Sequence, residues 1–191
     1  PILVLGGTGK TGRRVVERLT TRGIPTRIGS RSAQPRFDWA DQSTWAPVLH
    51  GVRAVYIPNP DLVVPGAPEV VRAFAELAIE HGVTRLVMLT GRGEDEAQRA
   101  EREVQATGAE VTVVRGAWFM QIFSEDFLLD SIRAGEVVLP ATDGQLDPFV
   151  DAVLEADGLV PGLDSDNRRT ALAIVARAFG IEESEPERRR R

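Results

Sequence analysis

The most informative stretch of this sequence is Ile2-Leu3-Val4-Leu5-Gly6-Gly7-Thr8-Gly9-Lys10-Thr11-Gly12. Its first four residues are apolar and indicate a buried strand, and residues 13–22 carry Val15, Val16 and Leu19 at helical spacing. A strand, a glycine turn and a helix in this order bring the N–H groups at the start of the helix against a pyrophosphate. The stretch therefore predicts that residues 6–12 bind a dinucleotide.

Two other interpretations of these residues stay open. Gly9-Lys10-Thr11 also occurs in Walker A loops, but that motif has another glycine five residues before Gly9, where this chain has Val4. The second alternative is a glycine-rich turn that binds no ligand. The strand and the helix on either side favour the dinucleotide site over both.

The composition indicates an ordinary globular protein. A chain of 191 residues suits one domain, and 42% hydrophobic residues are enough for a core. The net charge of −5 argues against nucleic-acid binding, and no apolar run approaches the roughly 18 residues that a membrane span needs. The absence of cysteine excludes thiol catalysis, disulfides and thiolate metal sites, and suits a reducing cytoplasm. Both histidines, His50 and His81, stand beside glycines at expected helix ends, so no metal site is expected.

Apolar strands alternate with helical patterns along most of the chain. Strands are expected at residues 26–29, 53–57, 85–90 and 111–115, and helices at residues 67–80, 93–107 and 126–133. The helix at 93–107 is charged and has a weak apolar stripe, so we expect it to lie on the surface. Repeated β-α-β units predict an α/β fold of the Rossmann type, a doubly wound parallel sheet in a three-layer α/β/α arrangement.

Four segments of the chain carry a specific family resemblance. They are Leu5-Gly6-Gly7-Thr8-Gly9-Lys10-Thr11-Gly12, Gly29-Ser30-Arg31-Ser32, Phe37-Asp38-Trp39 and Trp118-Phe119-Met120-Gln121-Ile122-Phe123-Ser124. With them the sequence resembles the NmrA-like branch of the atypical short-chain dehydrogenases/reductases. Within that branch it is similar to the ergot-alkaloid (festuclavine and agroclavine) dehydrogenases and their bacterial relatives. The resemblance covers residues 1–150 and implies an NAD(P)-binding Rossmann domain there.

The resemblance also implies how the rest of the chain is organised. Residues 151–180 correspond to a remnant of a C-terminal substrate-capping region, and residues 181–191 are expected to form a flexible tail. Family members are longer than this chain, the stretch around Pro58 looks short, and after Asp151 the chain departs from the family's sequence. Either segments are missing at these two places, or this is a reduced version of the fold.

The loop after the second strand favours NADP over NAD. NAD-specific sites hold an Asp or Glu about 20 residues beyond the glycines, where it binds the ribose 2′-OH. Residues 26–32 contain no acid and offer Arg31 between Ser30 and Ser32, whose guanidinium and hydroxyls suit a 2′-phosphate. An ordinary exposed loop arginine is the alternative. By resemblance Asp38 contacts the adenine amino group, the alternative being a turn or helix-capping carboxylate.

The sequence does not contain Tyr-x-x-x-Lys, the proton-donating pair of ordinary short-chain dehydrogenases. Its one tyrosine, Tyr56, falls in the third strand, and its one lysine, Lys10, falls in the glycine turn. Thr90, at the end of the fourth strand, matches a Ser or Thr of the family. It is the candidate catalytic residue, facing the nicotinamide or the substrate, with helix capping as the alternative.

An aromatic cluster supplies the candidate substrate pocket, formed by Trp118, Phe119, Met120 and Phe123. Aromatic residues after a strand also occur simply as core. Hydride transfer to an electron-poor acceptor such as a quinone or an imine needs orientation more than a protein acid. The sequence thus predicts a cytoplasmic NADPH-dependent oxidoreductase acting on a small organic substrate. A non-catalytic NADP(H)-sensing regulator, a scaffold without cofactor and a homodimer all stay open.

Overall fold

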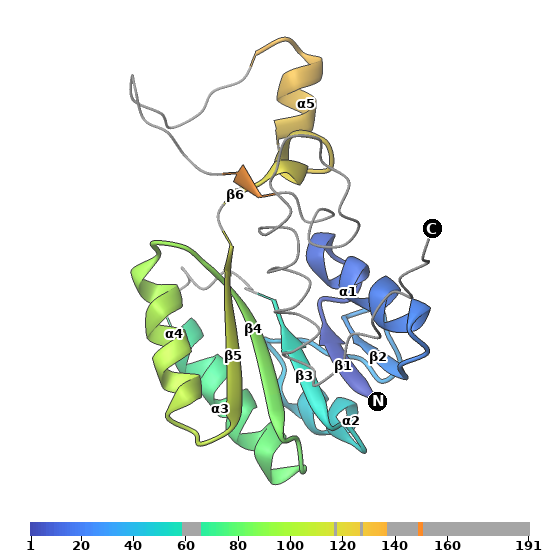
Figure 1. Cartoon of the computed structure of the whole chain (residues 1–191), viewed down its shortest axis with the longest axis vertical. Helices are drawn as coiled ribbons and strands as arrows, with labels where there is room; N and C mark the ends of the chain where they lie inside the picture. Colours follow the sequence, from blue (N-terminus) through green and yellow to red (C-terminus); the bar gives the residue numbers. More distant parts are fainter. Residues whose placement is uncertain (59–65, 117, 127, 137–148, 151–191) are drawn as a thin grey trace, which may run out of the picture.

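Five parallel strands form the centre of the protein, whose computed structural model describes residues 1–58, 66–116, 118–126, 128–136 and 149–150. The strands are β1 (Ile2–Leu5), β2 (Thr26–Gly29), β3 (Ala54–Ile57), β4 (Arg85–Gly91) and β5 (Glu110–Gly116). Their order across the sheet is β2-β1-β3-β4-β5, and Ile2 lies beside both Thr26 and Ala54 (Figure 1). The predicted doubly wound parallel sheet is confirmed.

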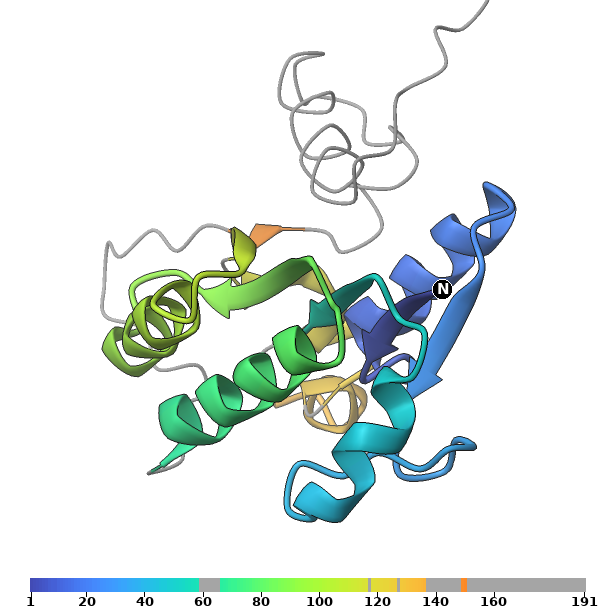
Figure 2. The same ribbon diagram turned by 90° about the horizontal axis from the view of Figure 1, so that it is seen from below.

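Helices cover both faces of this sheet. Helix α1 (Lys10–Thr21) packs on one face, and α2 (Trp45–Leu49), α3 (Ala67–Glu80) and α4 (Asp95–Gln105) pack on the other (Figure 2). The three-layer arrangement predicted from the β-α-β pattern is therefore confirmed. No helix in the described part of the chain is long and apolar enough to cross a membrane.

Strand β1 shows why the central strands are apolar on both sides. Ile2 and Val4 pack towards α1, whereas Leu3 and Leu5 pack towards α2, α3 and α4, and none of the four is exposed to solvent. Successive side chains of a strand point to opposite faces, so helices on both faces demand a continuous apolar run. The four-residue run before the glycine turn meets this demand.

The sequence predicted that the helix at residues 93–107 lies on the surface, but one side of this helix is buried. Helix α4 spans Asp95–Gln105, and its inner side is fully buried through Ala97, Ala100 and Val104. Two of these residues are alanines, which look weak in a pattern of large apolar residues. Their small side chains nevertheless let the helix lie close against its neighbours, including α3.

Several short elements extend the pattern read from the sequence. The 3₁₀ helix η1 (Gln42–Thr44) leads into α2, of which the sequence indicated only the end at His50. Beyond β5 come β6 (Trp118–Phe119), η2 (Met120–Phe123) and α5 (Leu128–Arg133), above the carboxyl ends of the strands, and β6 pairs in parallel with β7 (Phe149–Val150) (Figure 1). The helix expected at 126–133 is thus present but starts later. The substrate-capping remnant (151–180) and the tail (181–191) lie outside the described residues.

Candidate functional site

The glycine turn leaves the start of α1 open to a ligand. Gly6 has a φ of +59°, which favours glycine, and the Gly9 N–H donates to the Gly6 carbonyl at 2.8 Å. Helix α1 then begins at Lys10, and no side chain caps it. The first N–H groups of a helix have no partner within it and carry its positive dipole end, so this point suits a phosphate group.

Gly12 allows the helix to approach the turn. A Cβ atom at this position would lie 2.2 Å from the Gly6 carbonyl oxygen and 2.9 Å from the Gly7 Cα, both backbone atoms. At Gly9 a Cβ atom would meet only the Gly6 oxygen, at 3.2 Å. Gly12 is therefore a packing requirement of the fold, whereas a side chain at Gly9 needs only a small shift of the Gly6 carbonyl.

One open pocket of about 1590 Å³ runs along the carboxyl edge of the sheet. It includes the β1–β3 boundary, where the strand order reverses and where open α/β sheets bind their ligands. The predicted site residues that line it are Gly6, Thr8, Gly9, Lys10, Thr11, Ser30, Arg31, Ser32, Asp38, Thr90, Trp118 and Phe119. Gly7, Gly12, Met120 and Phe123, also predicted, are not among its lining residues.

The loop after β2 forms one end of the pocket. The Phe37 N–H donates to the Ser30 carbonyl at 2.9 Å and so closes the loop on itself. The hydroxyls of Ser30 and Ser32 lie 3.3 Å apart. Arg31 is exposed, lines the pocket, and has no hydrogen bond or ion pair with any described residue. Its guanidinium is thus available to an anion.

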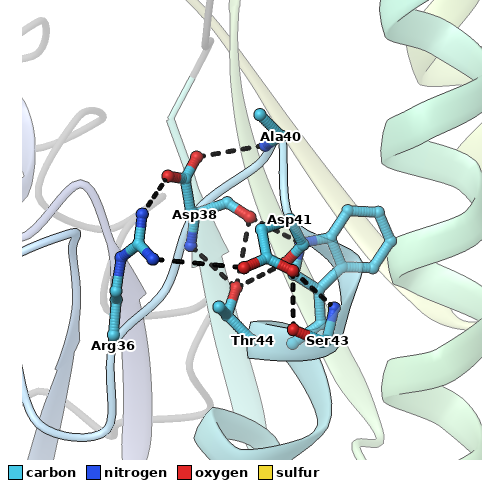
Figure 3. Close-up of polar contacts among 7 residues, drawn as sticks. Arg36, Asp38, Ala40, Asp41, Ser43 and Thr44 are labelled. Carbon is cyan, nitrogen blue, oxygen red and sulfur yellow. Dashed lines mark hydrogen bonds and ion pairs between the residues drawn. The ribbon is translucent and has the colours of Figure 1, made fainter.

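Asp38 is held rigidly beside this loop (Figure 3). Its carboxylate accepts from the Ala40 N–H at 3.1 Å and from Arg36 Nη2 at 2.7 Å, and its backbone carbonyl accepts from Trp45 Nε1 at 2.9 Å. The turn interaction named as the alternative role is therefore present. A carboxylate has about four lone-pair sites, so two bonds leave room for an amino group of a ligand.

Trp39 packs against three other aromatic rings. Its ring makes edge-to-face contacts with Phe37, Trp45 and Phe74, at centroid distances of 5.0, 5.9 and 5.2 Å. Such pairs add to the free energy gained by burial. The aromatic cluster anchors the loop that carries Asp38 to α2 and α3.

The opposite end of the pocket contains Thr90, which is 2% exposed. Its hydroxyl donates to Glu101 Oε1 on α4 at 2.6 Å, and Arg115 Nη2 on β5 binds Glu101 Oε2 at 2.5 Å. The Arg115 guanidinium holds the pKa of Glu101 below its usual range, the Thr90 bond lowers it further, and burial acts in the opposite direction. Glu101 is therefore buried in its ionised form. Thr90 bonds to this carboxylate and does not cap a helix.

The segment after η2 is tied to the start of α1 by ion pairs. Lys10 binds Asp126, and Arg14 holds Glu125 with Nη2 to Oε1 at 2.8 Å, while Arg13 also binds Glu125. Arg14 is the main cause that lowers the pKa of Glu125. Lys10 and Asp126 both line the pocket, so this pair lies at the start of α1, where a phosphate would bind.

Solved structures of dehydrogenases and reductases have the same fold. The NADPH-dependent quinone oxidoreductase of Escherichia coli, complexed with NADPH, has a TM-score of 0.55 at 19% identity over 70% of this chain and 53% of that chain. Triphenylmethane reductase of Citrobacter sp., complexed with NADP(H), has a TM-score of 0.53 at 17% identity over 70% of this chain and 53% of that chain. NmrA, a negative transcriptional regulator, has a TM-score of 0.53 at 12% identity over 63% of this chain and 48% of that chain.

Two curated relatives are closer in sequence. Agroclavine dehydrogenase of Claviceps fusiformis is 32% identical over 170 residues, covering 78% of this chain and 58% of that protein. Festuclavine dehydrogenase of Aspergillus fumigatus is 30% identical over 175 residues, covering 79% of this chain and 58% of that protein. The chain belongs to the NmrA-like branch of the short-chain dehydrogenases/reductases. No protein-family model matches it.

This NmrA-like chain spans less than two thirds of the length of the curated relatives it matches. Within its described residues, Tyr56 is buried on the face of β3 that packs on α1, and Lys10 is paired with Asp126. No group of three or more His, Asp or Glu side chains in this part is placed to hold a metal ion.

Sequence reasoning missed several further residues that line the pocket, among them Arg92, Glu94, Ile122 and Asp126. It also missed the Glu101–Arg115 pair, although a signal was present. Glu101 falls on the same helix side as Ala97, Ala100 and Val104, so a charged residue sits within the buried stripe. A buried charge needs a partner, and that need points to a hidden ion pair.

Proposed function

We propose that this NmrA-like chain binds NADP(H) and carries the cofactor half of an NADPH-dependent oxidoreductase that reduces a small organic acceptor such as a quinone or an imine. The observation that carries the proposal is the continuous pocket, which joins the open start of α1 to the Arg31 loop at one end and to Trp118 at the other. Bound NADPH would supply the hydride.

The loop after β2 supports NADP as the cofactor. Arg31 is a cation without a partner among the described residues, and its neighbours Ser30 and Ser32 supply hydroxyls on the same stretch of the pocket. A planar guanidinium binds a phosphate through two parallel N–H bonds. The carboxylate of Asp38 is oriented by Ala40 and so remains a candidate acceptor for the adenine amino group.

The end near β6 supports a flat, electron-poor acceptor. Trp118 is 45% exposed although it lines the pocket, and Phe119 lines it beside Gly116. An exposed aromatic ring next to an open cavity can stack on a planar molecule. The neighbours of similar fold act on a quinone and on triphenylmethane dyes, as their names state, and the relatives are alkaloid dehydrogenases.

The test of the cofactor is a calorimetric titration of the full chain with NADP⁺ and NAD⁺. We expect tighter binding of NADP⁺, and we expect Arg31→Ala to remove most of that preference, because a hydrogen bond to a charged group contributes about 1.5–3 kcal/mol. Arg99→Ala is the matched control, since Arg99 pairs with Glu69 on the outer side of α4 and α3. Equal affinity of the wild type for both dinucleotides would overturn the NADP assignment.

The test of the acceptor is a screen for NADPH oxidation with quinones and imines. For any substrate found, Trp118→Ala should raise KM by the equivalent of about 1–3 kcal/mol without changing NADP⁺ affinity. Ile132→Ala, which shortens another exposed apolar residue, is the control. An unchanged KM in Trp118→Ala would place the substrate elsewhere.

The same screen separates a second candidate, a non-catalytic NADP(H)-sensing regulator. It is favoured by the placement of Tyr56 and Lys10, since the first is buried in β3 and the second is paired with Asp126. Binding of NADP⁺ with no turnover of any acceptor would support the regulator over the reductase.

A further inference from the structure

A buried polar network lies under the β4–β5 end of the pocket. Thr90 donates to Glu101, and Arg115 binds the same carboxylate through Nε, at 3.0 Å from Oε1 and 3.1 Å from Oε2, and through Nη2 at 2.5 Å from Oε2. Glu101 is 2% exposed, so it depends on these two partners in place of water. Nothing in the proposed cofactor contacts requires this carboxylate.

The chemistry of the network fixes the direction of each hydrogen bond. An ionised carboxylate accepts only, and a guanidinium donates only, so the single proton of the Thr90 hydroxyl is directed at Glu101. Thr90 Oγ1 retains lone pairs, and it makes no other hydrogen bond with the described residues. Thr90 lines the pocket and its hydroxyl proton is already used, so a ligand group that bonds to Oγ1 has to be a donor.

We infer that Glu101 is a positioning residue that holds the Thr90 hydroxyl as a hydrogen-bond acceptor for an N–H group of a ligand in the pocket. The inference rests on the proposed function, because that function supplies the ligand. The N–H has two possible sources, the carboxamide of the nicotinamide ring and the protonated nitrogen of an iminium substrate or amine product. A quinone oxygen cannot take this place, since Thr90 has no proton left to donate, and Thr90 is not the proton donor of the reaction.

The test compares three variants of the full chain. Thr90→Val removes the acceptor at nearly constant volume, Thr90→Ser keeps it, and Glu101→Gln makes the neighbouring group able to donate to Thr90. Each is titrated with NADP⁺ and with 2′-phospho-ADP-ribose, which lacks the nicotinamide ring. Glu103→Gln is the control for losing a carboxylate from α4, since Glu103 pairs with Arg72 away from the pocket.

If the donor is the nicotinamide carboxamide, Thr90→Val should weaken NADP⁺ binding about tenfold and leave 2′-phospho-ADP-ribose unchanged, with Thr90→Ser close to wild type. If the donor is a substrate nitrogen, the KM of an imine should rise about tenfold in Thr90→Val while that of a quinone stays constant. In either case, Glu101→Gln should weaken binding of the same ligand as Thr90→Val does. Equal losses for both nucleotides, or none for any ligand, would overturn the inference. Failure of the wild type to bind NADP⁺ would instead contradict the proposed function.

Discussion

Gly12→Ala adds one methyl group at the point where α1 lies closest to the glycine turn. The new Cβ would stand 2.2 Å from the Gly6 carbonyl oxygen and 2.7 Å from its carbonyl carbon. Both are backbone atoms, so no change of rotamer can relieve the contact. The helix has to move away from the turn, and the packing of Leu19 on Ile2 and Val4 moves with it.

The size of the effect follows from two opposing contributions. Inserting a methyl group into a tightly packed site costs about 1–3 kcal/mol, and because the neighbours here are backbone atoms we take about 3 kcal/mol. Replacing glycine by alanine within a helix recovers up to about 1 kcal/mol. The net loss of about 2 kcal/mol should lower Tm by roughly 4–8 °C in a chain of this size.

Gly9→Ala is the matched control. Its Cβ would meet only the Gly6 oxygen, at 3.2 Å, and the extended backbone of Gly9, with φ −82° and ψ −179°, is open to any residue. We expect a Tm close to that of the wild type and weaker NADP⁺ binding, because Gly9 lines the pocket and a methyl group there occupies space next to the phosphate position.

Thermal unfolding followed by circular dichroism measures the first effect, and calorimetric titration with NADP⁺ measures the second. A Tm of Gly12→Ala equal to that of the wild type would refute the packing argument. Full NADP⁺ affinity in a folded Gly9→Ala would refute the placement of the phosphates at the start of α1.

The remaining predictions concern charge. Asp126→Asn should tighten NADP⁺ binding about two- to fivefold at low salt, because it frees Lys10 and removes a negative charge from a pocket for an anion; calorimetry at low and high salt checks this, and weaker binding would count against it. The free energy of unfolding should fall in acid, because the pKa values of Glu101 and Glu125 are lower in the folded protein than in the unfolded chain. The stability that these two carboxylates add is complete above their unfolded pKa of about 4.3, and it is lost as the pH drops through their folded pKa values. In urea unfolding between pH 3 and pH 7, Glu101→Gln should be less stable than the wild type at neutral pH and should depend less on pH; parallel curves would contradict the role of this carboxylate.

Local patterns in the sequence were enough to predict the parallel sheet and to suggest the glycine turn as a binding site. The run from Ile2 to Leu5, the glycines and the helix after them are consecutive, so their geometry follows from backbone rules and hydrophobic spacing alone. The repeated β-α-β order then implies a parallel sheet, and a parallel sheet collects the ends of its strands on one edge. Arg31 and Thr90 follow two of these strands, and both line the pocket at that edge.

Tertiary structure alone decided which charged groups meet. Lys10 and Asp126 are 116 residues apart, and Glu101 finds Thr90 and Arg115 through the register of β4 and β5 beneath α4. No local pattern encodes such pairs, since an ion pair depends on where crossovers deliver each side chain and on how much water is excluded around it. The same cause hid the burial of α4, because alanines become a packing surface only when a neighbouring helix lies against them.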